Sequence, residues 1–346
     1  MAPERIELTP RQQQILHRVV REYVVSGRPV GSKTIADHGG MSVSSSTIRS
    51  ELAELEALGL LTHPHTSAGR VPTEWGYRLF AGELLERPSL PPQPFPLDLF
   101  ALRTEVESAL QATSERLAEV TRLLALVSAP PLEATTIRHV EVLLLQPDVV
   151  VVVVITSTGG VTKHIVSFDG PVDPGILSWA REFLAERVVG LQLGSRLLRQ
   201  RFEEPELSTQ EHEFLAAIQP AFDRMLADDQ RLFVGGAAGL LGAARGEELD
   251  AYRRVLEMME QRAALLEILR DALDPKRPFV RVGGDFDDPA LRDVALVGAS
   301  YGLANRTLGT VSLLGPLRMD YAKAIDWVRA ASRALSRFVE DVYADN

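Results

Sequence analysis

The apolar residues near the amino terminus recur at intervals of three and four, which is the spacing of one face of an α-helix. Thr9 is placed to cap this helix, Pro10 to occupy its first turn, and Gln12 to complete a reciprocal capping box. The apolar side chains that would form its buried face are Ile15, Leu16, Val19, Val20 and Tyr23. The pattern therefore predicts a first helix from Pro10 to about Gly27.

Two shorter helices and two short extended segments follow along the chain. The pattern predicts a second helix over residues 31–38 and a third over residues 45–58. It then predicts two extended arms, 60–63 and 70–72, around a tip of small polar residues, with a fourth helix over 74–85 to anchor them. Helices followed by a hairpin in this order are typical of a winged helix-turn-helix, which is a DNA-binding fold.

A proline-rich stretch and a long helical pattern come next. Five prolines lie between residues 88 and 96, so this stretch is predicted to be a semi-rigid linker without regular structure. From Leu99 to Val127 the apolar positions alternate steps of three and four, which predicts a long helix. Two interpretations are open at this point. The helix either pairs with another chain or lies along its own domain.

From residue 139 the apolar pattern becomes that of strands, with turn residues between the runs. Strands are predicted at 139–145, 149–156, 161–168, 279–284, 294–303 and 307–315. Helices are predicted at about 175–189, 208–228 and 249–273, and from about residue 320 onward. Strands that are interrupted by helices and then resumed predict one α+β domain with an antiparallel sheet and an insertion.

Charge is distributed unevenly along the chain. The 346 residues carry a formal net charge of −10, yet residues 1–88 hold ten basic and ten acidic side chains and are neutral. Within residues 11–49, six basic side chains accompany only two acidic ones. An acidic body with a locally basic end is typical of a protein whose nucleic-acid contacts are confined to that end.

The composition excludes several classes of protein. The chain has no cysteine, which excludes disulfides, thiolate nucleophiles and cysteine-based zinc sites. Its amino terminus lacks the apolar core of a secretory signal, and its longest apolar run, residues 149–155, is far too short to span a membrane. We therefore expect a cytoplasmic protein without membrane contact.

One predicted group of DNA contacts lies at the start of the third helix. A helix-turn-helix places the first residues of its last helix at base edges in the major groove. In this chain they are Ser44, Ser45, Ser46, Thr47, Arg49 and Ser50. Small hydroxyls permit close approach, and the arginine can reach a guanine or a phosphate. A serine-rich helix cap explains this stretch alone, but the hairpin and the basic first helix, with Arg11 facing outward, favour DNA.

The hairpin tip is a second predicted contact with DNA. It is formed by His65, Thr66, Ser67, Ala68, Gly69 and Arg70. Small residues fit beside the phosphate backbone or in the narrow minor groove, where an arginine meets negative potential. Because nothing at the tip is large enough to pack, Arg70 is expected to point at solvent or at a partner.

Other candidate sites are weaker. His63 and His65 would share one face of a strand, but no Cys, Asp or Glu lies near them in sequence to complete a metal site. The glycine-rich residues 233–242 lack the Lys-Ser/Thr ending of a phosphate-binding loop and predict helix packing or a loop. The carboxylates at 286–289 predict a solvated loop. The polar residues Arg318, Asp320 and Tyr321 are candidates for enzymatic chemistry. A simpler explanation is that Asp320 caps the last helix. We expect no enzymatic activity, metal or cofactor.

Four motifs carry a resemblance to a known family: PVGSKT at 29–34, STIR at 46–49, PHTSAGRVPT at 64–73 and LGTVSLLGPLRMDYAKAIDWV at 308–328. Together they resemble the bacterial heat-inducible transcription repressor HrcA family, most specifically in the first 80 residues. The resemblance adds Ser32, Lys33 and Thr34 to the predicted DNA contacts. Ser46 stands where the family usually has alanine, and VGGDF at 282–286 replaces a common acidic-asparagine sequence.

The resemblance implies both a function and a domain order. It implies a homodimer that binds an inverted repeat of double-stranded DNA upstream of chaperone operons, with the chaperonin as the partner that keeps the repressor competent. The implied parts are a winged helix-turn-helix (1–86), a linker (87–97), a GAF-like α+β domain (98–170 and 246–346) and a mainly helical dimerising insertion (171–245). The alternative is a winged-helix regulator controlled by a small-molecule ligand in the GAF-like domain.

Overall fold

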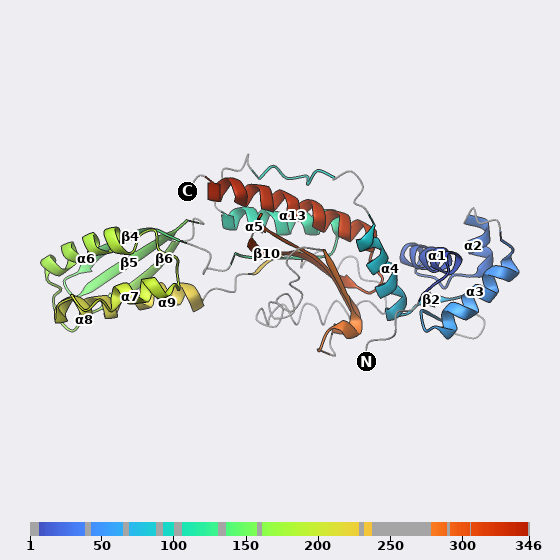
Figure 1. Cartoon of the computed structure of the whole chain (residues 1–346), viewed down its shortest axis with the longest axis horizontal. Helices are drawn as coiled ribbons and strands as arrows, with labels where there is room; N and C mark the ends of the chain where they lie inside the picture. Colours follow the sequence, from blue (N-terminus) through green and yellow to red (C-terminus); the bar gives the residue numbers. More distant parts are fainter. Residues whose placement is uncertain are drawn as a thin grey trace.

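The chain forms three units that follow one another along its longest axis (Figure 1). The computed structural model describes residues 7–38, 43–64, 69–87, 93–99, 106–130, 136–157, 161–227, 232–236, 278–288, 291–304 and 306–344. The amino-terminal unit, here called the head, comprises residues 7–87. A central unit is built on a five-stranded sheet, and an insertion unit at the far end is built on a three-stranded sheet.

The head has the predicted winged helix-turn-helix order. Its elements are α1 (Pro10–Ser26), α2 (Ser32–His38), α3 (Ser45–Ala57), β1 (Leu61–Thr62), β2 (Val71–Pro72) and α4 (Glu74–Glu86). The predicted capping box of α1 is present: the Thr9 hydroxyl accepts from the Gln12 backbone N–H, and the Gln12 side chain accepts from the Thr9 N–H. Gly27 ends the helix in the left-handed conformation, with φ 66°. Local chemistry therefore sets both ends of α1.

The hairpin, or wing, is tied to the segment that precedes α2. Val30 and Arg70 exchange two backbone hydrogen bonds of 2.8 and 2.9 Å, which form an isolated antiparallel bridge next to the pair β1–β2. Gly69 permits this approach, because a Cβ at that position would lie 2.5 Å from the carbonyl carbon of Val30. The base of the wing is thus fixed to the helical part of the head.

The central unit is an antiparallel sheet covered by two helices. Its strands have the order β7-β3-β10-β9-β8. Their bounds are Leu232–Gly235 (β7), Leu124–Ser128 (β3), Arg306–Pro316 (β10), Val294–Leu303 (β9) and Phe279–Val282 (β8), and a short 3-10 turn, η2 (Gly283–Asp285), follows β8. Helices α5 (Val106–Thr121) and α13 (Tyr321–Ala344) lie side by side on one face. They bury an apolar core that is continuous with that of the head.

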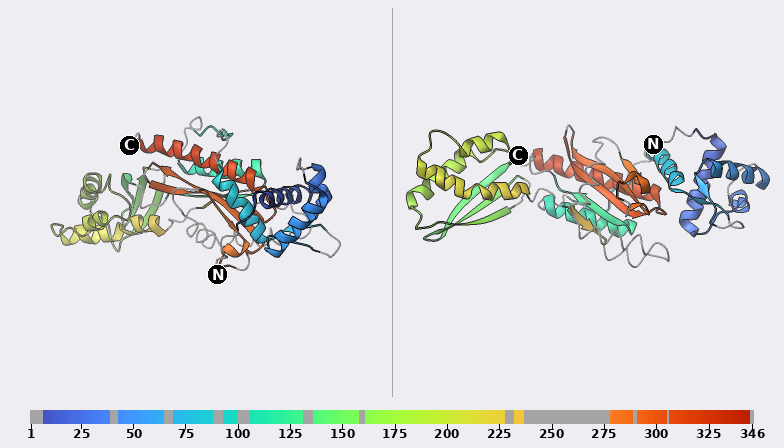
Figure 2. Two further views of the ribbon diagram at one scale, coloured as in Figure 1. Left: turned by 45° about the vertical axis from the view of Figure 1, so that its right-hand side comes forward. Right: turned by 90° about the horizontal axis from the view of Figure 1, so that it is seen from below.

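The insertion unit has a sheet and a core of its own. Its sheet has the order β4-β5-β6, with strands Ile137–Gln146, Val149–Thr156 and Val161–Ser167. Figure 2 shows the insertion unit from two directions. Four helices belong to this unit: α6 (Pro174–Arg187), α7 (Arg196–Phe202), α8 (Thr209–Ile218) and α9 (Pro220–Ala227). Helices α6, α8 and α9 contact the sheet, and α7 contacts α8. Their buried side chains form a core separate from that of the head and central unit.

The prediction that the strands after residue 139 form a single sheet is wrong, because they form two separate sheets. The strands predicted at 139–168 do not join the later strands, because their buried residues, such as Val142 and Val152, pack on Phe214 and the other apolar residues of α6–α9 instead. The segment inserted between strands β3 and β7 of the central sheet therefore contains β4–β6 as well as helices α6–α9. The predicted insertion, residues 171–245, left these three strands out. The predicted helix at 249–273 lies outside the described residues.

The long helix predicted from Leu99 to Val127 is also corrected. In the described residues α5 ends at Thr121, Arg122 has φ 60°, and Leu124 and Val127 belong to strand β3. The apolar run LALVS, residues 124–128, fits either the end of a helix or a buried strand. Its pairing with β10 and β7 makes it a strand. Because α5 packs on β3, β7 and α13, it lies along its own domain.

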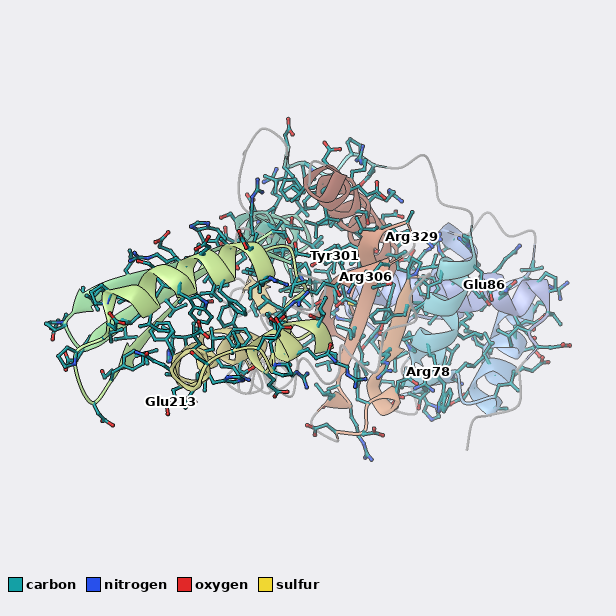
Figure 3. All side chains as sticks on the ribbon, turned by 60° about the vertical axis from the view of Figure 1, so that its left-hand side comes forward. Arg78, Glu86, Glu213, Tyr301, Arg306 and Arg329 are labelled. Carbon is teal, nitrogen blue, oxygen red and sulfur yellow. The ribbon has the colours of Figure 1, made fainter. Side chains whose placement is uncertain are left out.

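Two further segments differ from their predictions. Residues 233–235 of the glycine-rich stretch belong to edge strand β7 instead of a loop or helix. The proline-rich linker is docked where it is described: the Phe95 ring lies 6.4 Å from that of Trp327 on α13, and Arg116 Nε donates to the Pro96 carbonyl at 3.2 Å. The end of the linker therefore runs along the central unit, and α4 connects head and body (Figure 3).

Candidate nucleic-acid interface

The start of α3 gathers the hydroxyl groups that the sequence singled out. The Ser44 hydroxyl caps the helix by accepting from the Thr47 N–H at 3.2 Å, and it lies 2.7 Å from the Ser46 hydroxyl. The Ser45 and Ser32 hydroxyls are 3.1 Å apart and join α3 to α2. These residues thus form one polar surface across the two helices of the helix-turn-helix.

Cationic side chains flank this surface. Arg49 and Ser50 are exposed on the first turns of α3, Lys33 is exposed on α2, and Thr34 beside it is half-buried. Arg11, 52% exposed on α1, reaches Glu51 of α3 with an Nη1–Oε1 distance of 3.3 Å. The helix amino terminus, its hydroxyls and an exposed arginine together can meet phosphates and base edges, as in a helix that enters the major groove.

The wing is held against α3 by one carboxylate. Glu56, in the last turn of α3, pairs with His63 through Oε1, and its Oε2 lies 2.6 Å from Arg70 Nη2. Arg70 therefore does not simply point at solvent from the wing tip: it stands at the wing's base, bound to α3. Gly69 beside it is half-buried, whereas His65, Thr66 and Ser67 lie outside the described residues.

The two partners of Glu56 favour the charged form of its carboxyl group. Burial acts to raise the pKa of its carboxyl, but the hydrogen bond with His63 and the charge of Arg70 outweigh that effect and lower the pKa. The stability that this carboxylate gives the wing is present above the unfolded-state pKa. It is lost only as pH falls through the lower folded-state pKa.

Sequence reasoning missed Glu56, since a glutamate on an exposed helix carries no signal of its own. Only the fold places it between the two arms of the wing. His63 is partnered by this carboxylate, and no group of three or more metal-ligating side chains occurs in the described part of the chain. The arrangement is a structural clamp, and it gives no support to a metal site.

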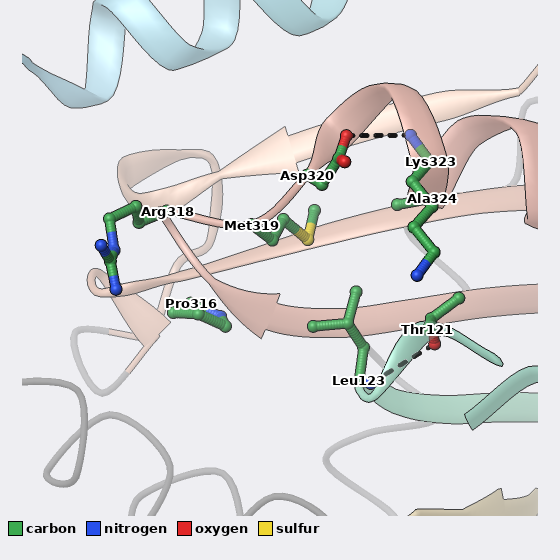
Figure 4. Close-up of a pocket in the computed structure, with 8 residues that line it drawn as sticks. All are labelled: Thr121, Leu123, Pro316, Arg318, Met319, Asp320, Lys323 and Ala324. Carbon is green, nitrogen blue, oxygen red and sulfur yellow. Dashed lines mark hydrogen bonds between the residues drawn. The ribbon is translucent and has the colours of Figure 1, made fainter. Parts of the chain in front are cut away.

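A shallow pocket of about 130 Å³ lies at the start of α13 (Figure 4). Its lining residues are Thr121, Leu123, Pro316, Arg318, Met319, Asp320, Lys323 and Ala324. Asp320 caps α13 by accepting from the Lys323 N–H at 3.0 Å, as predicted. The volume is well below the range of about 300–1,000 Å³ typical of small-molecule sites, so this pocket does not favour a ligand-controlled regulator.

Tyr321, the remaining candidate for enzymatic chemistry, is a core residue. Its ring packs on those of Tyr77 and Phe80, and its hydroxyl donates to the Leu317 carbonyl at 2.9 Å. Burial, together with the charge of Glu74 and the neighbouring Tyr77, raises the pKa of this hydroxyl well above its ordinary value. The side chain is neutral and inaccessible, which suits packing and not proton transfer. Within the described residues, no helix has the length and apolar character needed to cross a membrane.

A winged helix-turn-helix whose recognition helix opens with exposed hydroxyls and an arginine defines a DNA-binding regulator. Comparisons with known proteins agree. The profile described as "Winged helix-turn-helix transcription repressor, HrcA DNA-binding" matches residues 7–85, and that described as "HrcA protein C terminal domain" matches residues 107–325. The chain belongs to the HrcA family of heat-inducible transcription repressors.

Relatives match over almost the whole chain. A heat-inducible transcription repressor HrcA from Nocardia farcinica (strain IFM 10152) is 33% identical, with 100% of both chains covered. The protein of the same name from Parafrankia sp. (strain EAN1pec) is 31% identical over 97% of this chain and 98% of its own. A crystal structure of a hypothetical protein has the same fold, with a TM-score of 0.68, 22% identity, and 97% and 100% of the two chains covered.

Replacement of Arg49 by alanine should weaken operator binding and relax sequence preference. We expect a loss of about 1–3 kcal/mol if the side chain reads a base. Titration of operator and scrambled duplexes at several salt concentrations measures both effects. Arg116→Ala, on the distant helix α5, is the matched control. Equal affinity of Arg49→Ala and parent for both duplexes would contradict the assignment.

The Glu56→Gln variant tests the clamp at the base of the wing. The substitution keeps the shape of the side chain but removes its charge. His63 and Arg70 then lose the negative charge that pairs with them, and the wing is held less tightly against α3. Because the ion pairs of Glu56 with His63 and Arg70 are partly exposed, we expect a two- to fivefold loss of operator affinity, or about 0.4–1 kcal/mol. Tighter binding would show instead that Glu56 withholds Arg70 from phosphate.

Proposed function

We propose that the protein represses chaperone operons in the cytoplasm by binding an inverted-repeat operator as a homodimer. The observation that carries the proposal is the exposed amino terminus of α3, within a head whose family relatives are heat-inducible transcription repressors. One head serves one half-site, and a two-fold dimer matches a two-fold repeat. The acidic remainder of the chain disfavours contact with other DNA and leaves recognition to the heads.

One face of the β4–β6 sheet is not covered by any described element, and this face supports dimerisation through the insertion unit. Helices α6–α9 pack on its other face, while Leu143, Val161 and Ile165 are 46%, 61% and 51% exposed. The strand register aligns Leu143, Val151 and Ile165 across the sheet in one row. Large apolar side chains that are exposed on one face of a folded sheet are typical of an interface. We therefore assign the dimerising role to this unit.

The central unit fits the role of the GAF-like domain in this proposal. Its antiparallel sheet is covered on one face by α5 and α13, and it connects the head to the insertion unit. It would act as a rigid spacer that places each head at a fixed position relative to the dimer interface. This role needs no bound ligand and no enzymatic chemistry.

The heat response follows from stability linkage. A folded dimer of marginal stability is depleted as temperature rises, and chaperonin restores it by refolding chains that would otherwise aggregate. When other unfolded proteins occupy the chaperonin, repression lapses. The partner is thus a chaperonin that maintains the active population without contacting DNA.

An Ile165→Asp variant tests the dimer surface. A charge on the exposed sheet face should dissociate the dimer, because an unpaired carboxylate is costly to bury. We expect sedimentation as single chains and loss of affinity for the inverted repeat, with binding to one half-site unchanged. Ala185→Asp, on the exposed side of α6, is the control. An intact dimer in the Ile165→Asp variant would rule out this face.

Heating and cooling the purified protein tests the chaperonin linkage. We expect operator binding to fall after the heat pulse and to recover when chaperonin and ATP are added, because refolding then competes with aggregation. Fluorescence anisotropy of a labelled operator follows the active fraction over time. Full recovery without chaperonin, at any temperature that unfolds the chain, would contradict the linkage.

A further inference from the structure

Helix α4 belongs to the head, yet one of its sides packs on the central unit. The Tyr77 and Phe80 rings lie 5.8 and 6.4 Å from the ring of Tyr321 at the start of α13, and α4 also contacts strand β8. All three rings are buried. The head therefore shares an aromatic interface with the body, and the chain between them is not a free tether.

Arg78 anchors this interface with several polar contacts. Its Nε donates to Asp285 Oδ2 at 3.0 Å, and its Nη2 lies 2.7 Å from Asp285 Oδ1. The same Nη2 donates to the Val282 carbonyl and to Glu74 Oε1, each at 3.0 Å, and the guanidinium lies over the Trp75 ring at 4.1 Å. Two-point pairing of arginine with a carboxylate fixes orientation as well as distance. Figure 3 shows Arg78 where the head meets the central unit.

The loop that receives Arg78 is shaped for this contact. Gly283 has φ +50°, and a Cβ at this position would lie 2.5 Å from the Glu74 carboxyl carbon. Gly284 N–H donates to Glu74 Oε1 at 2.8 Å, and Asp285 Oδ2 also accepts from the Val282 N–H at 2.8 Å. The VGGDF sequence, a departure from the common family pattern, thus forms a preorganised seat for α4.

A second contact holds the other end of α4. Arg329 of α13 donates through Nη2 to the Leu85 carbonyl at 2.9 Å. The helix is therefore attached to the body near its amino terminus, through its aromatic side chains, and at its carboxyl terminus. Attachment at separated points along a helix opposes rotation of the head about any one of them.

We propose that Arg78, through Asp285 and Glu74, is a positioning residue that sets the distance between the two half-sites a dimer can bind. This inference rests on the proposed function as a dimeric repressor. Binding of the second head is intramolecular, and its effective concentration is highest when the span between the heads matches that between the half-sites. A head fixed on its body accepts one spacing, whereas a loosened head accepts several with lower affinity for each.

The experiment compares Arg78→Gln with the parent on two sets of duplexes. One set carries a single half-site, and the other carries inverted repeats whose spacer is changed by one base pair at a time. We expect the half-site Kd to stay within about twofold and the Kd for the natural spacing to weaken about five- to tenfold, because only the effective concentration changes. The preference for that spacing over its neighbours should shrink by a similar factor.

Several variants separate positioning from folding. Asp285→Asn should reproduce the broadened spacing profile, the double variant should add little to either change, and Arg78→Lys should recover part of the preference. Arg337→Gln, at an exposed position of α13 where the Nε donates to the Arg333 carbonyl of the same helix, should keep the parental profile. Thermal melting of each full-length variant checks that its head remains folded.

Two results would overturn the inference. One is a parental spacing profile for Arg78→Gln and Asp285→Asn. The other is a loss of half-site affinity as large as the loss on the full operator, since Arg78 would then support the head's own fold. If the parent binds single half-sites but no inverted repeat more tightly, the proposed dimeric function fails first, and this inference fails with it.

Discussion

The burial of α4 on two sides is the constraint on which the rest of the structure depends. Its apolar residues complete the core of the head, and its aromatic residues reach into the body. As a result one continuous cluster of buried side chains extends from Ile15 on α1 to Val339 on α13. A helix buried on both sides cannot move without exposing apolar surface. The DNA-binding surface is therefore coupled mechanically to the body.

The insertion unit, in contrast, does not share a core with the rest of the chain. Its four helices and its sheet close a separate core, so its fold does not depend on the head or central unit for burial. Within the described residues no helix covers the other face of the β4–β6 sheet, and that face carries large apolar side chains that are exposed. One chain thus combines a rigid connection at one end with an exposed apolar surface at the other, which is the arrangement that the proposed dimeric function requires.

Short-range chemistry explains why so much of the head could be predicted. Thr9, Gln12, Ser44 and Gly27 act on atoms within a few residues of themselves, so their caps are visible in sequence. The hydroxyl cluster of α3 is also local. Arg70 was harder to place, because its partner Glu56 is 14 residues away and lies on a different element. Nothing in the spacing of the two residues shows that a wing folds back onto the recognition helix.

Sequence alone determined the winged helix-turn-helix, the termini of α1, the cap at Asp320 and the charge difference between head and body, because each follows from neighbouring residues or from composition. Tertiary structure decided which strands share a sheet, that LALVS is a strand, and that Arg78 meets Asp285 across 207 residues of chain. An apolar run in the sequence indicates only that the segment is buried. The partner that buries it is selected by competition among all apolar surfaces of the chain, and that choice becomes visible only when the chain is folded.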